Sequence, residues 1–250
     1  MAIFEQVEAE KLGPVRSARS YYVEWACPYG ALYTHAGGSP QALALLGELD
    51  CLYNLEGLAY EGSYFWRGVD PVVPWNNLFT SSDNLKRYIQ DWALPRNGEY
   101  TGYLHKDDAP LETRPLTGTL AILSGWVYTV RYEYDRDTNT YLRFYKGRPH
   151  LDMLTGEQHR AHNVVVIFVE ESEIPGDPKR RMEILTTGRG EAMVFRDGIM
   201  IPGFWKRPTR YDELRLYNED GQEVAFNRGN IWIEALSIGQ EFKADLGRVP

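Results

Sequence analysis

The spacing of apolar residues changes near Leu116, and this change separates two halves that are expected to fold differently. Before this point, segments with helical spacing alternate with segments of strand character. After it, short apolar or alternating segments follow one another with only turn residues between them, and strands so close in sequence pair mostly antiparallel. The pattern predicts an α+β protein, with an α/β domain over residues 1–117 and a mostly antiparallel, β-rich domain over residues 118–250.

The first half contains two strand patterns and three helix patterns. Strands are predicted at Ala2–Val7 and Ala31–His35. Helices are predicted at Ser20–Ala26, at Ser39–Leu46 and through Trp92, the last one capped by Ser82 or Asp83. The second helix has the clearest start, because Ser39 suits the N-cap and Pro40 suits the first helical position. Residues 50–80 are rich in aromatic and turn-forming residues and are expected to form an irregular loop region, and residues 95–117 a linker.

The second half consists almost entirely of predicted strands. These are Trp126–Tyr134, Tyr141–Tyr145, Asn163–Glu170, Met182–Thr187, Glu191–Phe195, Ile199–Trp205, Glu213–Tyr217, Glu223–Phe226 and Ile231–Leu236. Turns such as Arg196-Asp197-Gly198 separate them. The segment Asn163–Glu170 is a continuous apolar run, which predicts a buried central strand, and Asn163 is expected to hold backbone in place at its start.

Composition argues against several classes of protein. The 250 residues carry a net charge of −8, whereas a nucleic-acid-binding surface is basic. No apolar run is long enough to span a bilayer, and the opening residues MAIFEQVEAE are not a signal segment, so the start is interpreted as a cut into a longer protein or an artificial beginning. Cys27 and Cys51 lack metal-site spacing, and a reduced pair and a disulfide are equally open. No cofactor is predicted.

Two neighbouring segments, Gly13–Arg19 (GPVRSAR) and His35–Pro40 (HAGGSP), form the main candidate site. Glycines let backbone approach a ligand, and the start of the following helix offers N–H groups with partial positive charge. Arginine binds anions in a bidentate manner, and histidine exchanges protons near neutral pH. The predicted ligand-binding residues are Arg16, Arg19, His35, Gly37, Gly38 and Ser39.

A purely structural interpretation of the same residues is also open. Ser39 is explained as a helix cap, the glycines as a tight turn, and the arginines as partners for some of the 35 acidic residues. Ser39 is not expected to be a nucleophile, because the chain shows no serine–base–carboxylate arrangement. The site prediction depends on one spatial condition: two guanidinium groups and an imidazole must face the same solvent-filled hollow.

A second cluster contains side chains of the types that bind zinc. Its members are His150, Asp152, His159 and His162. Their spacing matches no standard site, so no metal is predicted. His150 and Asp152 are instead expected to cap and pin the chain before the buried strand.

The third candidate is the glycine-containing segment of residues 188–207. Its glycines have neither the Lys-Ser/Thr pair nor the helix of a phosphate loop, so they are assigned to turns or bulges. Trp205, Lys206 and Arg207 either form a cationic-aromatic patch or belong to an ordinary edge strand.

Several segments together resemble the YerB-like bacterial lipoproteins, a two-part family of unknown function. The segments are GPVRSARSYYVEWA, ALYTHAGGSPQAL, YEYDRDTNTYLRF, GRPHLDMLTGEQ, NVVVIF, GRGEAMVFRDG, GFWKR and LYNEDGQEVAFNRGNIWIEAL. The resemblance spans most of residues 2–237 and implies an exported, membrane-anchored protein with an α/β portion followed by a β-rich portion. This chain departs from the family in lacking its Pro- and Arg-rich N-terminal stretch and in having Trp75 within Pro74–Asn77, where the family often has histidine.

Three hypotheses about function follow. The first is a non-catalytic extracytoplasmic domain that binds an anionic or glycan envelope ligand, or an envelope protein, and that associates with the membrane only through an anchor absent from this chain. The alternative is a hydrolase of envelope phosphodiester or glycosidic bonds, with His35 as acid or base and Arg16 and Arg19 stabilising negative charge. Its carboxylates cannot be ranked among Glu24, Glu48, Asp50 and Glu56. The third is a scaffold that docks partners through its β-rich half.

Overall fold

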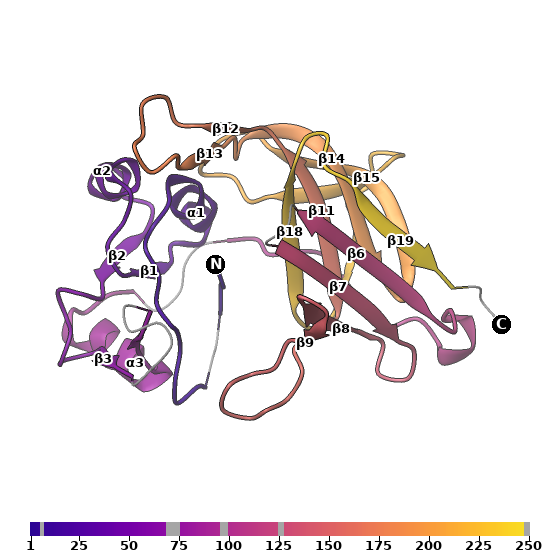
Figure 1. The fold of residues 1–250 in the computed structure, drawn as a ribbon, viewed down its shortest axis with the longest axis horizontal. Helices are drawn as coiled ribbons and strands as arrows, with labels where there is room; N and C mark the ends of the chain where they lie inside the picture. The colour runs from indigo at the N-terminus through magenta and orange to yellow at the C-terminus, as the bar shows by residue number, and fades with distance from the viewer. Residues whose placement is uncertain (6–7, 69–75, 96–99, 125–127, 248–250) are drawn as a thin grey trace. The chain divides into compact units, whose positions relative to one another are not determined.

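The computed structural model describes all residues except 6–7, 69–75, 96–99, 125–127 and 248–250. Its chain forms two compact units (Figure 1). The first, called the α/β unit, comprises Met1–Thr101 and Thr209–Glu213, and the second, called the β unit, comprises Gly102–Pro208 and Leu214–Pro250. Within the described residues, no helix has the length and apolar character needed to cross a membrane.

The α/β unit is built from short helices and strands. In chain order these are α1 (Ser20–Ala26), the 3-10 helix η1 (Cys27–Tyr29), β1 (Leu32–His35), α2 (Pro40–Glu48), β2 (Tyr53–Glu56), β3 (Trp66–Arg67), β4 (Leu78–Phe79) and α3 (Ser82–Asp91). β1 and β2 pair in parallel, with His35 opposite Glu56. Two buried clusters stabilise the unit, one including Val23, Ala42 and Leu46 and the other Leu55, Phe65 and Leu78.

The helices of this unit follow from local sequence signals. α1 has the bounds predicted for it. Ser39 caps α2, since its hydroxyl accepts a hydrogen bond from the backbone N–H of Ala42 at 3.2 Å, and Pro40 is the first helical residue. α3 is capped one residue earlier than expected, by Ser81. Capping chemistry therefore located the starts of α2 and α3 to within a residue.

The strand predictions for this unit are less accurate. The predicted strand Ala2–Val7 is wrong for Ala2–Glu5, which form no strand, while Gln6 and Val7 lie outside the described residues. The region expected to be irregular, residues 50–80, contains β2, whose pairing with β1 is a long-range contact that local spacing does not reveal.

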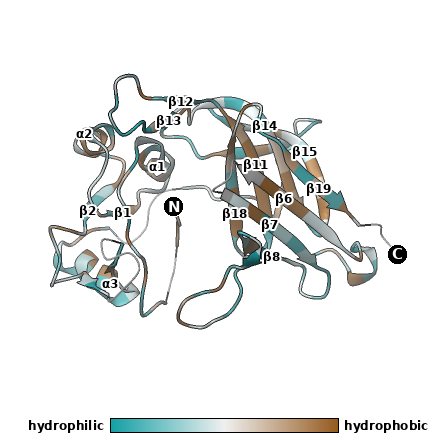
Figure 2. Ribbon diagram, viewed as in Figure 1, coloured by the Kyte–Doolittle hydropathy of each residue, from teal (hydrophilic) through white to brown (hydrophobic). Residues whose placement is uncertain are grey.

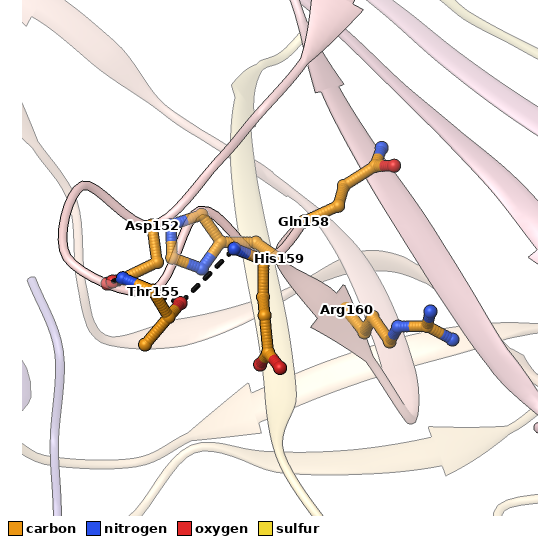
Figure 3. A pocket seen from close by; sticks show the side chains of 6 residues that line it. Asp152, Thr155, Gln158, His159 and Arg160 are labelled. Carbon is orange, nitrogen blue, oxygen red and sulfur yellow. Dashed lines mark hydrogen bonds between the residues drawn. The ribbon is translucent and has the colours of Figure 1, made fainter.

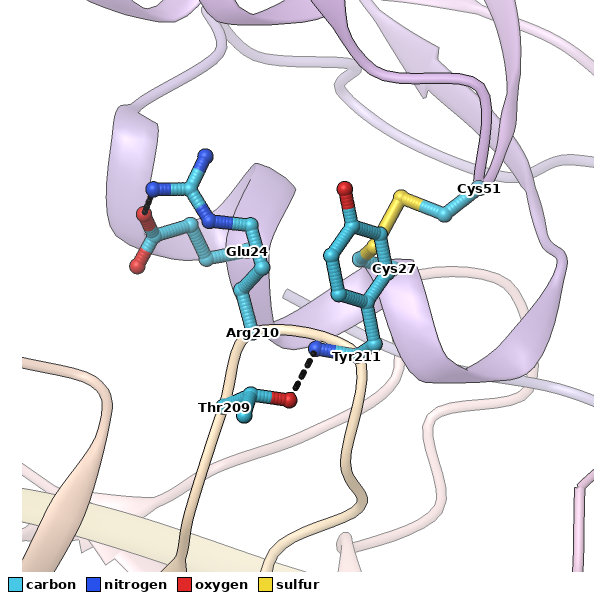
Figure 4. The surroundings of a disulfide bond; sticks show 6 residues. All are labelled: Glu24, Cys27, Cys51, Thr209, Arg210 and Tyr211. Carbon is cyan, nitrogen blue, oxygen red and sulfur yellow. Dashed lines mark hydrogen bonds and ion pairs between the residues drawn. A yellow bond between two sulfur atoms is a disulfide. The ribbon is translucent and has the colours of Figure 1, made fainter.

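Cys27 and Cys51 form a disulfide that joins the end of α1, through η1, to the chain just before β2 (Figure 4). Figure 4 shows the Tyr211 ring beside this bond, and Arg210 forms an ion pair of 3.6 Å with Glu24 of α1. Of the two states left open by the sequence, the structure has the disulfide. Such bonds persist in oxidising compartments outside the cytoplasm.

Replacing both cysteines with serine is expected to lower the free energy of unfolding of the α/β unit by about 3 kcal/mol, because the bond restricts the unfolded chain. This loss is measured by urea unfolding, with hydrogen exchange at the amides of α1 and β2 as the probe. Wild-type protein treated with a reducing agent is the matched control and should lose the same amount. Equal stability of the reduced and oxidised proteins would contradict the prediction.

The β unit consists mainly of a six-stranded sheet and a five-stranded sheet. Their strands are β6 (Gly118–Ser124), β7 (Tyr128–Asp135), β8 (Thr140–Tyr145), β10 (Arg160–Ala161), β11 (Asn163–Val169), β14 (Gly188–Arg196), β15 (Ile199–Arg207), β16 (Arg215–Asn218), β18 (Ile231–Ser237) and β19 (Phe242–Leu246). One sheet has the order β10–β8–β7–β6–β19, with the short strand β9 (Arg148–Pro149) beside β8, and the other has the order β16–β15–β14–β11–β18.

The two sheets share one hydrophobic core, so the unit is a β-sandwich. Leu120, Ile122 and Tyr132 come from the first sheet, and Val164 and Phe195 from the second. Figure 2 shows hydrophobic residues concentrated along the strands of both sheets. Burial of this apolar surface is the main force that holds the sheets together.

Shorter elements complete this unit. They are β5 (His105–Lys106), which pairs in parallel with β17 (Phe226–Asn227), the 3-10 helix η2 (Leu111–Thr113), and the antiparallel pair β12 (Glu171–Glu173) and β13 (Met182–Ile184). Residues 105–106 lie in the segment expected to be a linker, yet the structure pairs them with β17.

The β-rich, mostly antiparallel character of the C-terminal portion is confirmed, and the chain is an α+β protein. β11 lies between β14 and β18, and its buried residues confirm the predicted central strand, although its pairing with β18 is parallel. Asn163 fixes backbone as expected: its amide donates to the carbonyl of Asn227 at 2.9 Å and accepts from the Asn227 N–H at 2.9 Å.

Both interpretations of Trp205, Lys206 and Arg207 are wrong. β15 has neighbours on both sides, β14 and β16, so it is not an edge strand. Trp205 and Arg207 are buried, with exposed fractions of 3% and 1%, so the three residues form no exposed patch. The Trp205 indole donates to the carbonyl of Phe168 at 2.8 Å across Gly190, where a Cβ would lie 2.6 Å from that oxygen. Close backbone approach, not ligand binding, explains this glycine.

Candidate functional site

The structure brings the two segments of the main candidate site side by side. The N–H of Ala36 donates to the carbonyl of Arg16 at 3.0 Å, and the N–H of Ala18 donates to the carbonyl of Gly37 at 2.9 Å. Gly37 has a φ of +65°, a conformation that favours glycine. The proximity inferred from the sequence is therefore present in the backbone.

His35, however, faces the interior of the α/β unit. Its exposed fraction is 1%, and both ring nitrogens have hydrogen-bond partners. Nδ1 lies 2.8 Å from the carbonyl oxygen of Gly37, and Nε2 lies 2.7 Å from the side-chain oxygen of Asn54. The expectation that this imidazole faces a solvent-filled hollow is wrong, because β1 places it on the buried side.

The N–H of Gly37, expected to bind a ligand, donates to Glu56. Both carboxylate oxygens lie within reach, at 3.0 and 3.1 Å, and the same carboxylate accepts from the N–H of Leu58 at 3.0 Å. Glu56 also approaches Nδ1 of His35, at 3.4 Å. A carboxylate of the chain itself therefore occupies the position at which an anionic ligand was predicted.

The remaining predicted ligand residues do not converge on one point. Ser39 is buried and caps α2, and a Cβ on Gly38 would lie 2.9 Å from the Leu43 side chain. Arg16 is exposed, whereas Arg19 is partly buried and donates to the carbonyl of Ala18 at 2.8 Å. The structural interpretation accounts for most of this cluster, and ligand binding by it stays a prediction.

A hollow of about 570 Å³ lies in the β unit, at the loop between β9 and β10 (Figure 3). The residues that line it all have polar or charged side chains: Asp152, Thr155, Glu157, Gln158, His159 and Arg160. In Figure 3 the His159 ring lies beside Asp152, whereas Gln158 and Arg160 extend in the other direction. This hollow gathers more polar side chains at the surface than the glycine turn does.

Asp152 organises the loop. Its carboxylate accepts hydrogen bonds from the N–H groups of Leu154 and Thr155, both at 2.9 Å, and from the Thr155 hydroxyl at 3.2 Å. The Thr155 and Leu154 backbone bonds lower the pKa of Asp152 below its usual range. The carboxylate is therefore ionised and fixed in place at neutral pH.

A buried polar network lies next to this loop. Arg143 of β8 and Glu234 of β18 form an ion pair of 3.5 Å, with side-chain exposures of 5% and 7%. The Tyr132 hydroxyl donates to Glu234 at 2.6 Å, and Arg143 donates to that hydroxyl at 3.1 Å. The Arg143 guanidinium also lies over the Trp232 ring, 4.4 Å from its centroid. These contacts connect three strands from both sheets.

His150 connects this network to the hollow. Its Nδ1 lies 2.6 Å from the Arg143 guanidinium, which has only donors, so Nδ1 is the acceptor and the imidazole carries its proton on Nε2. Burial, Arg143 and His159 lower the pKa of His150 to about 4. The rings of His150 and His159 lie 4.5 Å apart, and the His159 ring borders the hollow. His150 is thus a neutral support for His159.

The second cluster predicted from the sequence is only partly assembled. His150, Asp152 and His159 belong to the loop beside the hollow, whereas His162 lies apart and binds Asn230, with Nδ1 2.9 Å from the amide oxygen. Among the described residues, no group of histidine, cysteine and carboxylate side chains is suited to hold a metal ion. The structural role predicted for His150 and Asp152 is confirmed by their loop contacts.

Sequence reasoning missed four residues beside this site: Tyr132, Arg143, Trp232 and Glu234. One signal was available for Arg143. Residues two positions apart in a strand lie on the same face, so a buried Tyr141 in this predicted strand implies a buried Arg143, and the structure has both buried. Trp75, where the resemblance indicated an altered site, lies outside the described residues.

Comparisons with known proteins concern both units. Residues 1–94 match the family described as "Protein of unknown function (DUF3048) N-terminal domain", and residues 122–233 match "Protein of unknown function (DUF3048) C-terminal domain". The chain is 28% identical over 241 residues to a Bacillus subtilis (strain 168) protein named "Putative lipoprotein YerB", covering 94% of this chain and 70% of that relative. The crystal structure of YerB from Bacillus subtilis has the same fold, with a TM-score of 0.82 and 24% identity over 95% of this chain and 78% of the other.

Proposed function

The chain belongs to the YerB-like family of proteins of unknown function (DUF3048), and on this premise we propose that it is an extracytoplasmic protein that binds a component of the cell envelope in the polar hollow of its β unit. The lipoprotein name of the Bacillus subtilis relative supports the location outside the cytoplasm. The disulfide between Cys27 and Cys51 supports it independently, because such bonds persist in oxidising compartments.

The observation that carries the binding proposal is the hollow itself. It is concave and accessible, and its lining combines carboxylate, hydroxyl, amide, imidazole and guanidinium groups. Asp152 is fixed by three hydrogen bonds, and Gln158 donates from its amide to the carbonyl of Arg143 at 2.8 Å. A lining held in this way loses little conformational freedom when a ligand binds.

The hydrolase alternative receives no support from the geometry around His35. A general acid or base must reach the reacting atom, directly or through one water molecule. The imidazole is buried, and its nitrogens are engaged with Gly37 and Asn54. This favours the proposal of ligand binding by the β unit over hydrolysis at His35.

Mapping by NMR tests this proposal. In ¹⁵N-labelled protein, a binding ligand from a panel of envelope saccharides and phosphate-containing polymers is expected to shift the amides of residues 151–160. Replacing His159 with alanine should weaken binding about tenfold, since one lost hydrogen bond contributes about 1 kcal/mol or more. Arg16→Ala, at the glycine turn, is the matched control and should change affinity less than twofold. Shifts confined to residues 16–39, or a loss of binding in Arg16→Ala alone, would overturn the proposal.

A further inference from the structure

We infer that the ligand of this hollow is uncharged and rich in hydroxyl groups, as a neutral glycan is, and is not an anionic polymer. The inference rests on the proposed function and adds the chemical class of ligand. It follows from two observations. Carboxylates contribute to the lining of the hollow, and the arginines nearby are paired with acidic residues.

Two carboxylates contribute to the lining. Asp152 is held ionised by the N–H groups of Thr155 and Leu154, which lower its pKa. Glu157 is exposed and brings a second carboxylate to the same loop. Both oxygens of a carboxylate accept hydrogen bonds, so these groups suit the hydroxyl donors of a sugar and repel phosphate or carboxylate ligands.

The cations near the hollow have acidic partners. Arg160 lies 3.4 Å from the carboxylate of Asp135 and 3.3 Å from the Thr138 hydroxyl. Arg143 is buried against Glu234, with a side-chain exposure of 5%. These guanidinium groups therefore do not present an uncompensated positive charge to a ligand.

His150 adds no positive charge at neutral pH. The guanidinium of Arg143, 2.6 Å from Nδ1, requires a neutral imidazole that accepts the hydrogen bond. A second proton on this ring would place two cations in contact. His150 thus places a neutral polar ring against His159 at the edge of the hollow, which suits recognition of hydroxyl groups.

The remaining lining also suits a sugar. The Thr155 hydroxyl both donates and accepts, and the six lining side chains include no apolar residue, which disfavours lipid chains. The net charge of −8 makes the whole chain repel polyanions over longer distances. Charge and hydrogen-bonding chemistry both favour a neutral, hydroxylated ligand.

The test compares three soluble probes by NMR and isothermal titration calorimetry: tetra-N-acetylglucosamine, poly(glycerol phosphate) and tetralysine. Tetra-N-acetylglucosamine is expected to shift the amides of residues 151–160 and to bind equally in low and high salt, because the interaction involves no ion pair. Glu157→Gln should weaken this binding about fivefold, since an amide is a poorer acceptor than a carboxylate. Glu219→Gln, an exposed carboxylate elsewhere in the β unit, is the control and should have no effect.

The outcomes separate this inference from the proposed function. Binding of poly(glycerol phosphate) at residues 151–160, strengthened by Glu157→Gln, would overturn the ligand class and leave the binding site intact. Preferential binding of tetralysine, weakened by Glu157→Gln and by salt, would do the same. Failure of all three probes, together with the wider panel described above, to shift these amides would overturn both.

Discussion

Replacing Arg143 with methionine is expected to lower the free energy of unfolding of the β unit by about 3–5 kcal/mol. Methionine keeps most of the side-chain volume but removes the charge that faces Glu234 at 3.5 Å in the sandwich interior. Removing one partner of a buried ion pair leaves the other charge desolvated without its counter-charge. Burial and Glu234 raise the pKa of Tyr132, so its hydroxyl keeps its proton and still donates to the carboxylate.

The double variant Arg143→Met, Glu234→Gln is the matched control. Glutamine still accepts the hydrogen bond of Tyr132 but carries no charge, so the double variant should regain about 1–2 kcal/mol relative to Arg143→Met alone. Urea unfolding, followed through the tryptophans of the β unit, measures both. If Arg143→Met costs less than about 1 kcal/mol, the buried charge of Glu234 is not what the guanidinium stabilises.

Local sequence signals predicted the elements whose structure depends on neighbours in the chain. Ser39 and Pro40 specify the start of α2 because the cap and the fixed φ act within one helical turn. The apolar run that begins after Asn163 specifies β11 because a strand that is buried throughout tolerates no alternating polar residues. In both cases the physical cause lies within a few residues.

The orientation of His35 also had a local signal. In β1 partly buried and buried residues alternate, and Tyr33 and His35 are on the buried face. A period of two places residues 33 and 35 together, so a predicted strand with an inward Tyr33 implies an inward His35. The site prediction used proximity in sequence without this directional information.

Other contacts could not be predicted from local sequence signals. The carboxylate of Glu56 reaches Gly37, 19 positions earlier in the sequence, only because β1 and β2 pair in parallel, and the segment between these strands does not specify that pairing. Arg143 and Glu234 are 91 residues apart and meet through the packing of two sheets. Such contacts depend on tertiary structure, which explains why the network of Tyr132, Arg143 and Glu234 was missed although the loop beside it, with Asp152 and His159, was noticed in the sequence.

Replacing Asp197 with alanine is expected to destabilise the β unit by on the order of 5 kcal/mol, because several donors lose one shared acceptor. Asp197 is 4% exposed and lies at the turn between β14 and β15. Its carboxylate accepts hydrogen bonds from five groups, the side chains of Lys106, Asn139, Arg196 and Asn227 and the N–H of Ala109, at 2.7–3.1 Å. Two of these donors carry positive charge and are themselves partly buried.

The pH dependence of this effect distinguishes charge from packing. Burial alone raises the pKa of Asp197, but the bonds from Lys106, Asn139 and Asn227 outweigh it and hold the pKa far below the ordinary value of 3.8. A carboxyl whose pKa is lower in the folded state stabilises the fold above the unfolded pKa, and this stabilisation is lost as the pH falls towards the folded pKa. The stability difference between wild type and Asp197→Asn should therefore be constant from pH 7 to about 5 and shrink below about 4. A difference that stays the same at pH 3, measured by urea unfolding, would assign the role of this residue to shape and not to charge.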